Sequence, residues 1–304
     1  MRVAAIDCGT NSIRLLVADV VDDSLTDIDR RMEVVRLGEG VDRTGRFSDA
    51  ALERTFVACE RYAEVIEREG AERVRFVATS ASRDVDNRTA FVDGVVNRLG
   101  VEPDVITGSE EAHLSFTGAV RGLALADSPR LVVDIGGGST EFVMGDRVPD
   151  HAISVDIGCV RMTERCLRSD PPTGEEVDAA TADIDAAIDR ALAVVPAQEA
   201  ASLIGVAGSV TTVAAIALDL PTYDPARIHG SVISAAEVEE VTARLLAMAR
   251  TDRSAMPVMH PGRVDVIGGG ALILRQILRR TGQGSVIVSE HDILDGIAWA
   301  LASG

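Results

Sequence analysis

Two stretches of the chain combine an aspartate with glycine and small hydroxyl residues between apolar runs. IDCGTNSIRLLV begins at Ile6, and VDIGGGSTEFVM begins at Val133. Glycine lets the backbone approach an anion closely, and consecutive backbone N–H groups form a concave anion site. The hydroxyl groups can donate further hydrogen bonds. The candidate phosphate ligands are therefore Gly9, Thr10, Asn11, Ser12, Gly136, Gly137, Gly138 and Ser139.

Carboxylates accompany both turns. Asp7 and Asp134 precede the two turns, and Glu141 follows the second. A carboxylate repels a bound phosphate unless a cation lies between them, so these residues predict Mg²⁺ or another divalent cation such as Mn²⁺, held largely through water. A single Asp-x-Gly could be an ordinary hairpin turn. Three consecutive glycines, however, cost conformational entropy on folding, and strands avoid glycine. An ordinary turn would not need them, so we favour phosphate binding by the pair of turns.

The charge of the chain excludes several functions. Its formal net charge is −18, and all 30 of its basic residues are arginine. The absence of lysine excludes a Walker A loop, a protein kinase and Schiff-base chemistry. Because the chain is acidic and has no long apolar run, we expect neither nucleic acid nor a membrane to be its partner. We expect a cytoplasmic location. The four cysteines lack metal-ligand spacing and are expected to be reduced thiols.

The elements that position the turns recur along the chain. Strands are expected at Arg2–Asp7 and Ile13–Val20 around the first turn, and at Arg130–Ile135 and Thr140–Met144 around the second. Helical patterns follow each hairpin, and the first of these helices is expected to be capped by Ser48 and to continue to Gly70. LADSPR reads as a linker between the two halves. The repeat predicts two similar α/β domains, residues 1–124 and 125–304, with the option that the last helix packs back on the first domain.

The order of the motifs resembles a known family. The chain resembles the Ppx/GppA phosphatases of the actin, sugar-kinase and heat-shock-chaperone ATPase superfamily. The matching stretches are IDCGTNSIRLLV, ATSASRD, ITGSEEAHLSFTGAV, VVDIGGGSTEFV, SVDIGCVRMTE, GVAGSVTTVAAI and GRVDVIGGGALIL. The resemblance implies two ribonuclease-H-like (actin-like ATPase) domains with the active site in the cleft between them. It also implies removal of terminal phosphates from inorganic polyphosphate or guanosine pentaphosphate. Longer relatives append an HD-like domain, so we expect this chain to be the short form.

The resemblance also implies roles for particular residues. Glu111 matches the general base that activates water, and Arg83 matches a phosphate ligand. Gly208 and Ser209 match a loop that faces a nucleotide. The adjacent acids Glu110 and Glu111 also allow a purely structural interpretation. In it, Thr107 to Glu110 form a helix capping box, with Glu110 as the structural acid. Two further features stay open. Strand alternation could point Arg14 away from the first turn, and Gly268–Gly270 reads as close packing or as a ligand wall.

These observations together predict an exopolyphosphatase that prefers short chains. The alternatives are a guanosine pentaphosphate phosphohydrolase, a kinase of the same superfamily, and a protein that binds polyphosphate or guanosine tetraphosphate or pentaphosphate with weak catalysis. A homodimer is an open alternative to a monomer.

Overall fold

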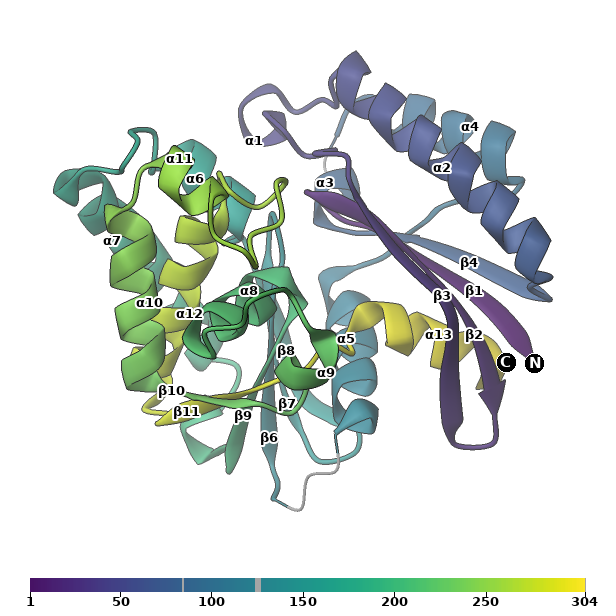
Figure 1. The fold of residues 1–304 in the computed structure, drawn as a ribbon. Coiled ribbons are helices and arrows are strands. Elements are labelled where there is room, and N and C mark those ends of the chain that lie inside the picture. Colours follow the sequence, from purple (N-terminus) through teal and green to yellow (C-terminus); the bar gives the residue numbers. More distant parts are fainter. Residues whose placement is uncertain (84, 124–126, 304) are drawn as a thin grey trace. The chain divides into compact units, whose positions relative to one another are not determined.

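The computed structural model describes residues 1–83, 85–123 and 127–303, and the chain forms two compact units (Figure 1). Unit 1 comprises Met1–Gly118 and Ile293–Gly304, and unit 2 comprises Ala119–Asp292. The domain boundary expected between residues 124 and 125 lies outside the described residues. No helix in the described ranges is both long and apolar enough to cross a membrane.

Unit 1 is built on a five-stranded sheet of order β3-β2-β1-β4-β5. Three antiparallel strands form a meander, and the two others run parallel to β1. The strands are β1 (Arg2–Cys8), β2 (Ser12–Val21), β3 (Ser24–Val34), β4 (Arg73–Ala78) and β5 (Asp104–Val105). Apolar residues at both odd and even positions bury both faces of β1, which makes it the central strand of the unit.

Helices cover both faces of this sheet (Figure 1). Ala4 and Ile6 of β1 lie in a core with α2 (Asp49–Glu69) and α4 (Arg88–Leu99), whereas Val3 and Ala5 lie in a second core with α13 (Ile293–Ser303). The Ser48 side chain caps α2 by accepting a hydrogen bond from the Ala51 N–H, and α2 ends at Gly70, as predicted. The remaining helices are α1 (Val41–Thr44), α3 (Ser80–Arg83) and α5 (Gly108–Gly122).

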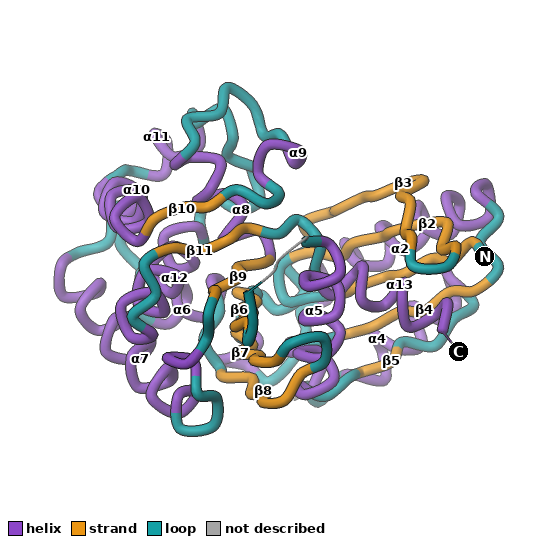
Figure 2. The backbone as a smooth tube through the Cα atoms, turned by 90° about the horizontal axis from the view of Figure 1, so that it is seen from below, coloured by secondary structure: helices purple, strands orange, loops and turns teal. Residues whose placement is uncertain are grey.

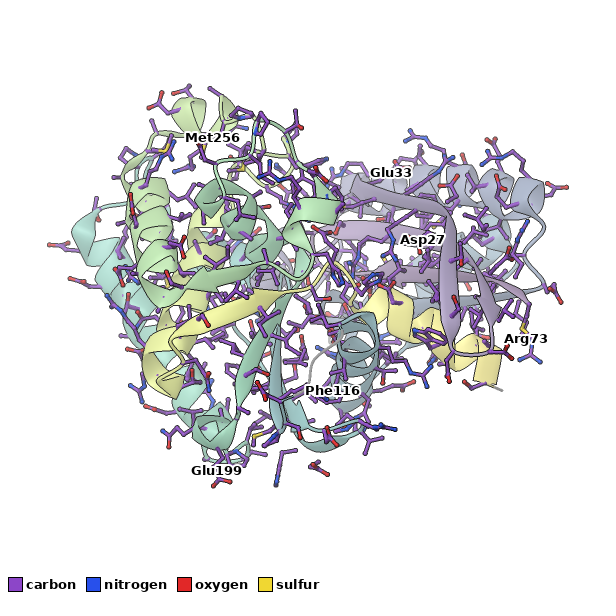
Figure 3. The ribbon with its side chains drawn as sticks, turned by 60° about the horizontal axis from the view of Figure 1, so that its bottom comes forward. Asp27, Glu33, Arg73, Phe116, Glu199 and Met256 are labelled. Atoms are coloured by element: carbon purple, nitrogen blue, oxygen red, sulfur yellow. The ribbon has the colours of Figure 1, made fainter. Side chains whose placement is uncertain are left out.

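An ion pair joins the last helix to the edge strand of unit 1. Asp295, in the first turn of α13, is almost fully buried, and its carboxylate accepts hydrogen bonds of 2.5 and 3.3 Å from Arg30 of β3. Arg30 also donates to Asp27 at 2.7 Å, and Asp27 is an exposed residue of the same strand, labelled in Figure 3. The guanidinium therefore lies between a buried and an exposed carboxylate.

We expect Asp295→Asn to lower the free energy of unfolding by about 2 kcal/mol, because it leaves the partly buried Arg30 with a weaker partner. Asp27→Asn removes the exposed half of the same arrangement and should cost less than about 0.5 kcal/mol. Urea unfolding followed by circular dichroism measures both values. Equal effects of the two substitutions would show that the buried pair does not anchor α13.

Unit 2 repeats the arrangement of unit 1 on a six-stranded sheet of order β10-β11-β9-β6-β7-β8. β6, β7 and β8 form an antiparallel meander, and β9 runs parallel to β6 as β4 runs parallel to β1. The strands are β6 (Arg130–Ile135), β7 (Thr140–Gly145), β8 (Pro149–Val155), β9 (Ser202–Val206), β10 (Val232–Ser234) and β11 (Ser285–Val288). The predicted internal repeat is confirmed.

The helices of unit 2 include several that the sequence pattern did not predict, and two of these have more than ten residues. Figure 2 shows α6, α7, α10 and α12 gathered on the same side of the strands. The helices of the unit are α6 (Cys159–Arg165), α7 (Gly174–Leu192), α8 (Ala207–Ala217), α9 (Pro225–Ile228), α10 (Ala235–Ala247), α11 (Arg250–Ser254) and α12 (Ile267–Thr281). Helices α8 and α12 begin in glycine-containing stretches, which by themselves disfavour helix.

The glycines that begin α12 allow close helix packing. A Cβ atom on Gly270 would lie 2.3 Å from the Ser209 hydroxyl oxygen, and one on Gly269 would lie 2.9 Å from the Cys159 carbonyl oxygen. The first turn of α12 therefore touches the starts of α8 and α6, and no larger residue fits there. Of the two interpretations of Gly268–Gly270, these contacts support close packing.

Candidate active site

The first glycine turn joins β1 to β2 and presents its N–H groups to one side. The Gly9 N–H donates to the Ser12 carbonyl at 2.9 Å and closes the turn. The carbonyls of Thr10 and Asn11 accept hydrogen bonds of 2.8 to 3.1 Å from N–H groups of residues 35–38. In a trans peptide the N–H points opposite to the carbonyl of the same unit, so the N–H groups of Asn11 and Ser12 face away from that segment. This geometry suits an anion.

Asp7 has a cationic partner across the hairpin. Asp7 and Arg14 are opposite each other in the β1–β2 register, and Arg14 donates to one Asp7 carboxylate oxygen from Nη2 at 2.6 Å and Nε at 3.0 Å. The orientation of Arg14, which the sequence left open, is one in which its guanidinium lies beside Asp7. The register places both side chains on the same face of the sheet. The negative charge of Asp7 is thus offset by the chain itself.

Arg83 and Glu111 meet in unit 1. Arg83 ends α3, and its Nη1 donates to Glu111 Oε2 at 2.7 Å, with 21% and 10% of the two side chains exposed. The neighbouring Glu110 side chain is 44% exposed and binds Arg75 at 2.6 Å instead. Two adjacent glutamates therefore have different arginine partners, and only Glu111 shares an ion pair with the candidate phosphate ligand.

The capping box expected at this helix forms only in part. The Thr107 hydroxyl accepts a hydrogen bond from the Glu110 N–H at 3.2 Å, as predicted. The Glu110 carboxylate binds Arg75 in β4. A guanidinium is a stronger partner for a carboxylate than a backbone N–H, which explains the difference.

The second glycine turn joins β6 to β7 and rests on the start of α6. The carbonyls of Gly136 and Gly137 accept hydrogen bonds of 2.9 to 3.1 Å from the first N–H groups of α6, and the Gly138 carbonyl accepts one of 2.7 Å from Arg161 Nε. The same trans-peptide geometry turns the N–H groups of Gly137, Gly138 and Ser139 to the opposite side. Three consecutive donors facing one way form an anion site.

Arg161 and Gly158 support this turn, and the sequence analysis did not single them out. A Cβ atom on Gly158 would lie 2.4 Å from the backbone of Gly137, so α6 can approach the turn only with glycine there. Both residues belong to the motif SVDIGCVRMTE, but neither spacing nor residue type indicates a contact with a turn 20 residues earlier.

Asp134 and Glu141 form a pair of buried carboxylates. They are opposite each other in the β6–β7 register and are 6% and 1% exposed. Glu141 accepts a hydrogen bond of 2.7 Å from Ser154 of β8. Like charges directly opposite on a sheet repel each other, so a cation would stabilise this pair.

The two hairpins differ at one equivalent position. Each aspartate faces the residue seven positions later, which is Arg14 in the first hairpin and Glu141 in the second. The second hairpin thus has an acid where the first has an internal cation. Two carboxylates with water and phosphate oxygens are a typical Mg²⁺ environment. No group of three His, Cys, Asp or Glu side chains in the described ranges could hold a metal by itself, so water or phosphate oxygens would have to complete the coordination.

The loop at Gly208 and Ser209 lies at the start of α8. Ala207 just before it has a φ of 67°, an uncommon conformation for a residue with a side chain. A Cβ atom on Gly208 would lie within 2 Å of the Arg263 guanidinium, at 1.4 to 1.7 Å. Arg263 therefore lies against this loop. Nothing about the isolated arginine in the stretch GRVDVIGGG predicted this contact. In this region the pKa of Tyr223 is raised, mainly by burial and to a lesser extent by the nearby Glu290 carboxylate.

Known proteins are similar to this chain in sequence and fold. The sequence profile of the Ppx/GppA phosphatase family matches residues 16–302. Exopolyphosphatase 2 of Mycobacterium tuberculosis is 51% identical over 99% of this chain and 98% of its own length. Guanosine-5'-triphosphate,3'-diphosphate pyrophosphatase of Photobacterium profundum is 37% identical over 60% of this chain and 36% of its own length. A crystal structure of an exopolyphosphatase-like protein is 44% identical, with a TM-score of 0.96 over 100% of this chain and 97% of that one.

These matches confirm the α/β fold with two repeated units that the resemblance implied. Since the family profile spans nearly the whole sequence, this chain belongs to the Ppx/GppA phosphatase family.

Proposed function

We propose that this protein is an exopolyphosphatase that hydrolyses the terminal phosphate of inorganic polyphosphate and prefers short chains. The observation that carries the proposal is the second hairpin. There, three backbone N–H groups face one way beside the buried Asp134 and Glu141. Donors for phosphate next to carboxylates for a divalent cation are the combination that phosphoanhydride hydrolysis requires.

Each site residue receives a role in this proposal. Glu111 accepts a proton from water as the water oxygen attacks the terminal phosphorus, and Arg83 binds an oxygen of the phosphate and offsets the charge that develops there. Asp134 and Glu141, with a lesser contribution from Asp7, hold Mg²⁺ or Mn²⁺. When bound, this ion neutralises phosphate oxygens and orients the chain. The turn N–H groups at Gly9–Ser12 and Gly136–Ser139 bind successive phosphates.

Guanosine pentaphosphate is the second candidate substrate. The similarity to the Photobacterium profundum pyrophosphatase favours it, although that match covers only 60% of this chain. Under this alternative the Gly208–Ser209 loop faces the nucleoside. The same catalytic residues serve either substrate, because both end in a phosphoanhydride.

A side-by-side assay distinguishes these substrates. We expect kcat/KM for phosphate release from tripolyphosphate to exceed the values for guanosine pentaphosphate and ATP at least tenfold, at equal Mg²⁺. Initial rates of orthophosphate release measure this, with the Glu111→Gln variant as the control for contaminating phosphatases. A higher value for guanosine pentaphosphate would establish the second candidate. Binding of tripolyphosphate without release from any substrate would indicate a binding protein.

We further propose a cytoplasmic location, where thiols stay reduced. Cys8, Cys59 and Cys159 are buried and Cys166 is partly buried, all as free thiols. Burial raises the pKa of Cys59 to about 12 and that of Cys8 well above its usual value, so both remain neutral at physiological pH. A homodimer remains an alternative to a monomer.

A further inference from the structure

The ion pair between Arg83 and Glu111 joins two groups that the proposed function uses separately. The donor is Arg83 Nη1, the acceptor is Glu111 Oε2, and the distance is 2.7 Å. Both side chains are largely buried, so solvent screens the interaction less than at an exposed pair. In this arrangement the proposed phosphate ligand binds the proposed base.

A carboxylate in such a pair is a weak base. A guanidinium at hydrogen-bond distance stabilises the ionised carboxylate, which lowers its affinity for a proton. General-base catalysis is most efficient when the base has substantial proton affinity at the working pH. Glu111 paired with Arg83 is therefore poorly suited to take a proton from water.

Phosphate is a competing partner for the same arginine. Arginine binds phosphate through charge-assisted hydrogen bonds, often two at once. Arg83 is the last residue of α3, and its carbonyl accepts a hydrogen bond from the Arg88 guanidinium. The Arg83 side chain can then exchange partners by rotation about its own bonds, without movement of α3.

We propose that the terminal phosphate of the substrate opens this ion pair and thereby activates Glu111 as the base. This inference rests on the proposed function. Arg83 transfers its hydrogen bond from Glu111 to a phosphate oxygen, and the carboxylate then faces a polyanion instead of a cation. Its affinity for protons rises as a result. Glu111 takes a proton from water, the water oxygen bonds to phosphorus, and the bridging P–O bond breaks with its electron pair on the departing chain.

This coupling makes the base strong only when substrate is bound. Substrate binding and protonation of Glu111 both release Arg83 from the pair, so by linkage each favours the other. Removal of the Glu111 charge should therefore strengthen phosphate binding, although it abolishes turnover. A residue that merely supported the fold would not produce this opposite effect on affinity and rate.

Glu110 and Arg75 provide a matched control. Glu110 lies in the same turn of α5 as Glu111, and it forms a pair of similar length, 2.6 Å, with Arg75 of β4. Arg75 also binds Asp104 at 2.5 Å. Glu111 forms its ion pair with a different arginine, Arg83 of α3. Glu110→Gln removes a neighbouring charge from α5 without touching the Arg83–Glu111 pair.

The experiment measures binding of imidodiphosphate, which resists hydrolysis, by titration calorimetry with Mg²⁺ present. We expect Glu111→Gln to bind about tenfold more tightly than the unchanged protein, and Glu110→Gln to stay within twofold. Near pH 5, titrations in two buffers of different ionisation enthalpy should show proton uptake on binding by the unchanged protein and by Glu110→Gln. That uptake should be smaller for Glu111→Gln, which has no carboxylate at this position to protonate. Any proton bound by the probe itself is common to all three proteins and cancels in the comparison.

Equal affinity of Glu111→Gln and the unchanged protein, or equal proton uptake by all three proteins, would overturn the switch. If Glu111→Gln does not fold, proton uptake by Glu111→Asp decides, because the shorter side chain weakens the pair but keeps the titrating group. Inactivity with unchanged affinity would leave the base role standing and remove the switch. Tighter binding with full activity would remove the base role and leave the competition for Arg83 standing.

Discussion

Glu111→Gln is expected to lower kcat for phosphate release from short polyphosphate by about 10²–10⁴-fold, the usual effect of removing a general base. Glutamine keeps the size of the side chain and can still accept a hydrogen bond from Arg83. It cannot take a proton from water at neutral pH. Glu111 lies at a largely buried position in α5, so the substitution exposes no new group to solvent. The loss of rate should therefore come from the chemical step.

The neighbouring acid serves as the control for this prediction. Glu110→Gln disrupts a half-exposed pair with Arg75, so it should change kcat less than threefold and stability by less than about 1 kcal/mol. Steady-state kinetics and thermal unfolding of both variants give the comparison. A larger loss of rate in Glu110→Gln at unchanged stability would mean that the base has been assigned to the wrong glutamate.

Asp134→Asn is expected to lower kcat about 10²–10³-fold at a fixed Mg²⁺ concentration, and excess chelator should abolish phosphate release by the unchanged protein. The carboxylate pair of Asp134 and Glu141 supplies the charge that attracts the cation. Loss of one electrostatic contact in a buried site typically costs this much. The variant should also need more Mg²⁺ to reach half of its maximal rate.

A separate measurement links this effect to cation binding. Mg²⁺ alone should raise the melting temperature of the unchanged protein and raise it less in Asp134→Asn. Asp150→Asn, at an exposed position of the neighbouring strand β8, should behave like the unchanged protein in both assays. Undiminished activity in excess chelator would rule out the proposed role of the metal.

The sequence by itself determined the two hairpins and their repeat. Apolar runs on both sides of Asp7 and Asp134 can be buried as paired strands, and the glycines between them permit the backbone conformations that a tight turn requires. Local signals also located α2, because Ser48 and Gly70 satisfy backbone groups at its two ends. These features depend on residues close in the chain.

The pairing of charged side chains depended on the tertiary structure. Whether Arg14 faces Asp7 is a matter of strand register, in which a shift of one residue moves a side chain to the other face. Arg83 and Glu111 come from different helices, and no local pattern encodes their distance of 2.7 Å.

The glycines of α12 also show where tertiary packing, and not the local sequence, decides the structure. Gly269 and Gly270 have poor helix propensity, and the sequence analysis predicted no helix there. The close approach of the Cys159 carbonyl and of Ser209 leaves no room for a side chain, so tertiary contacts outweigh the local preference. Helix formation at this point is decided by burial against α6 and α8, which only the folded chain supplies, whereas the hairpin turns are decided by the residues within them.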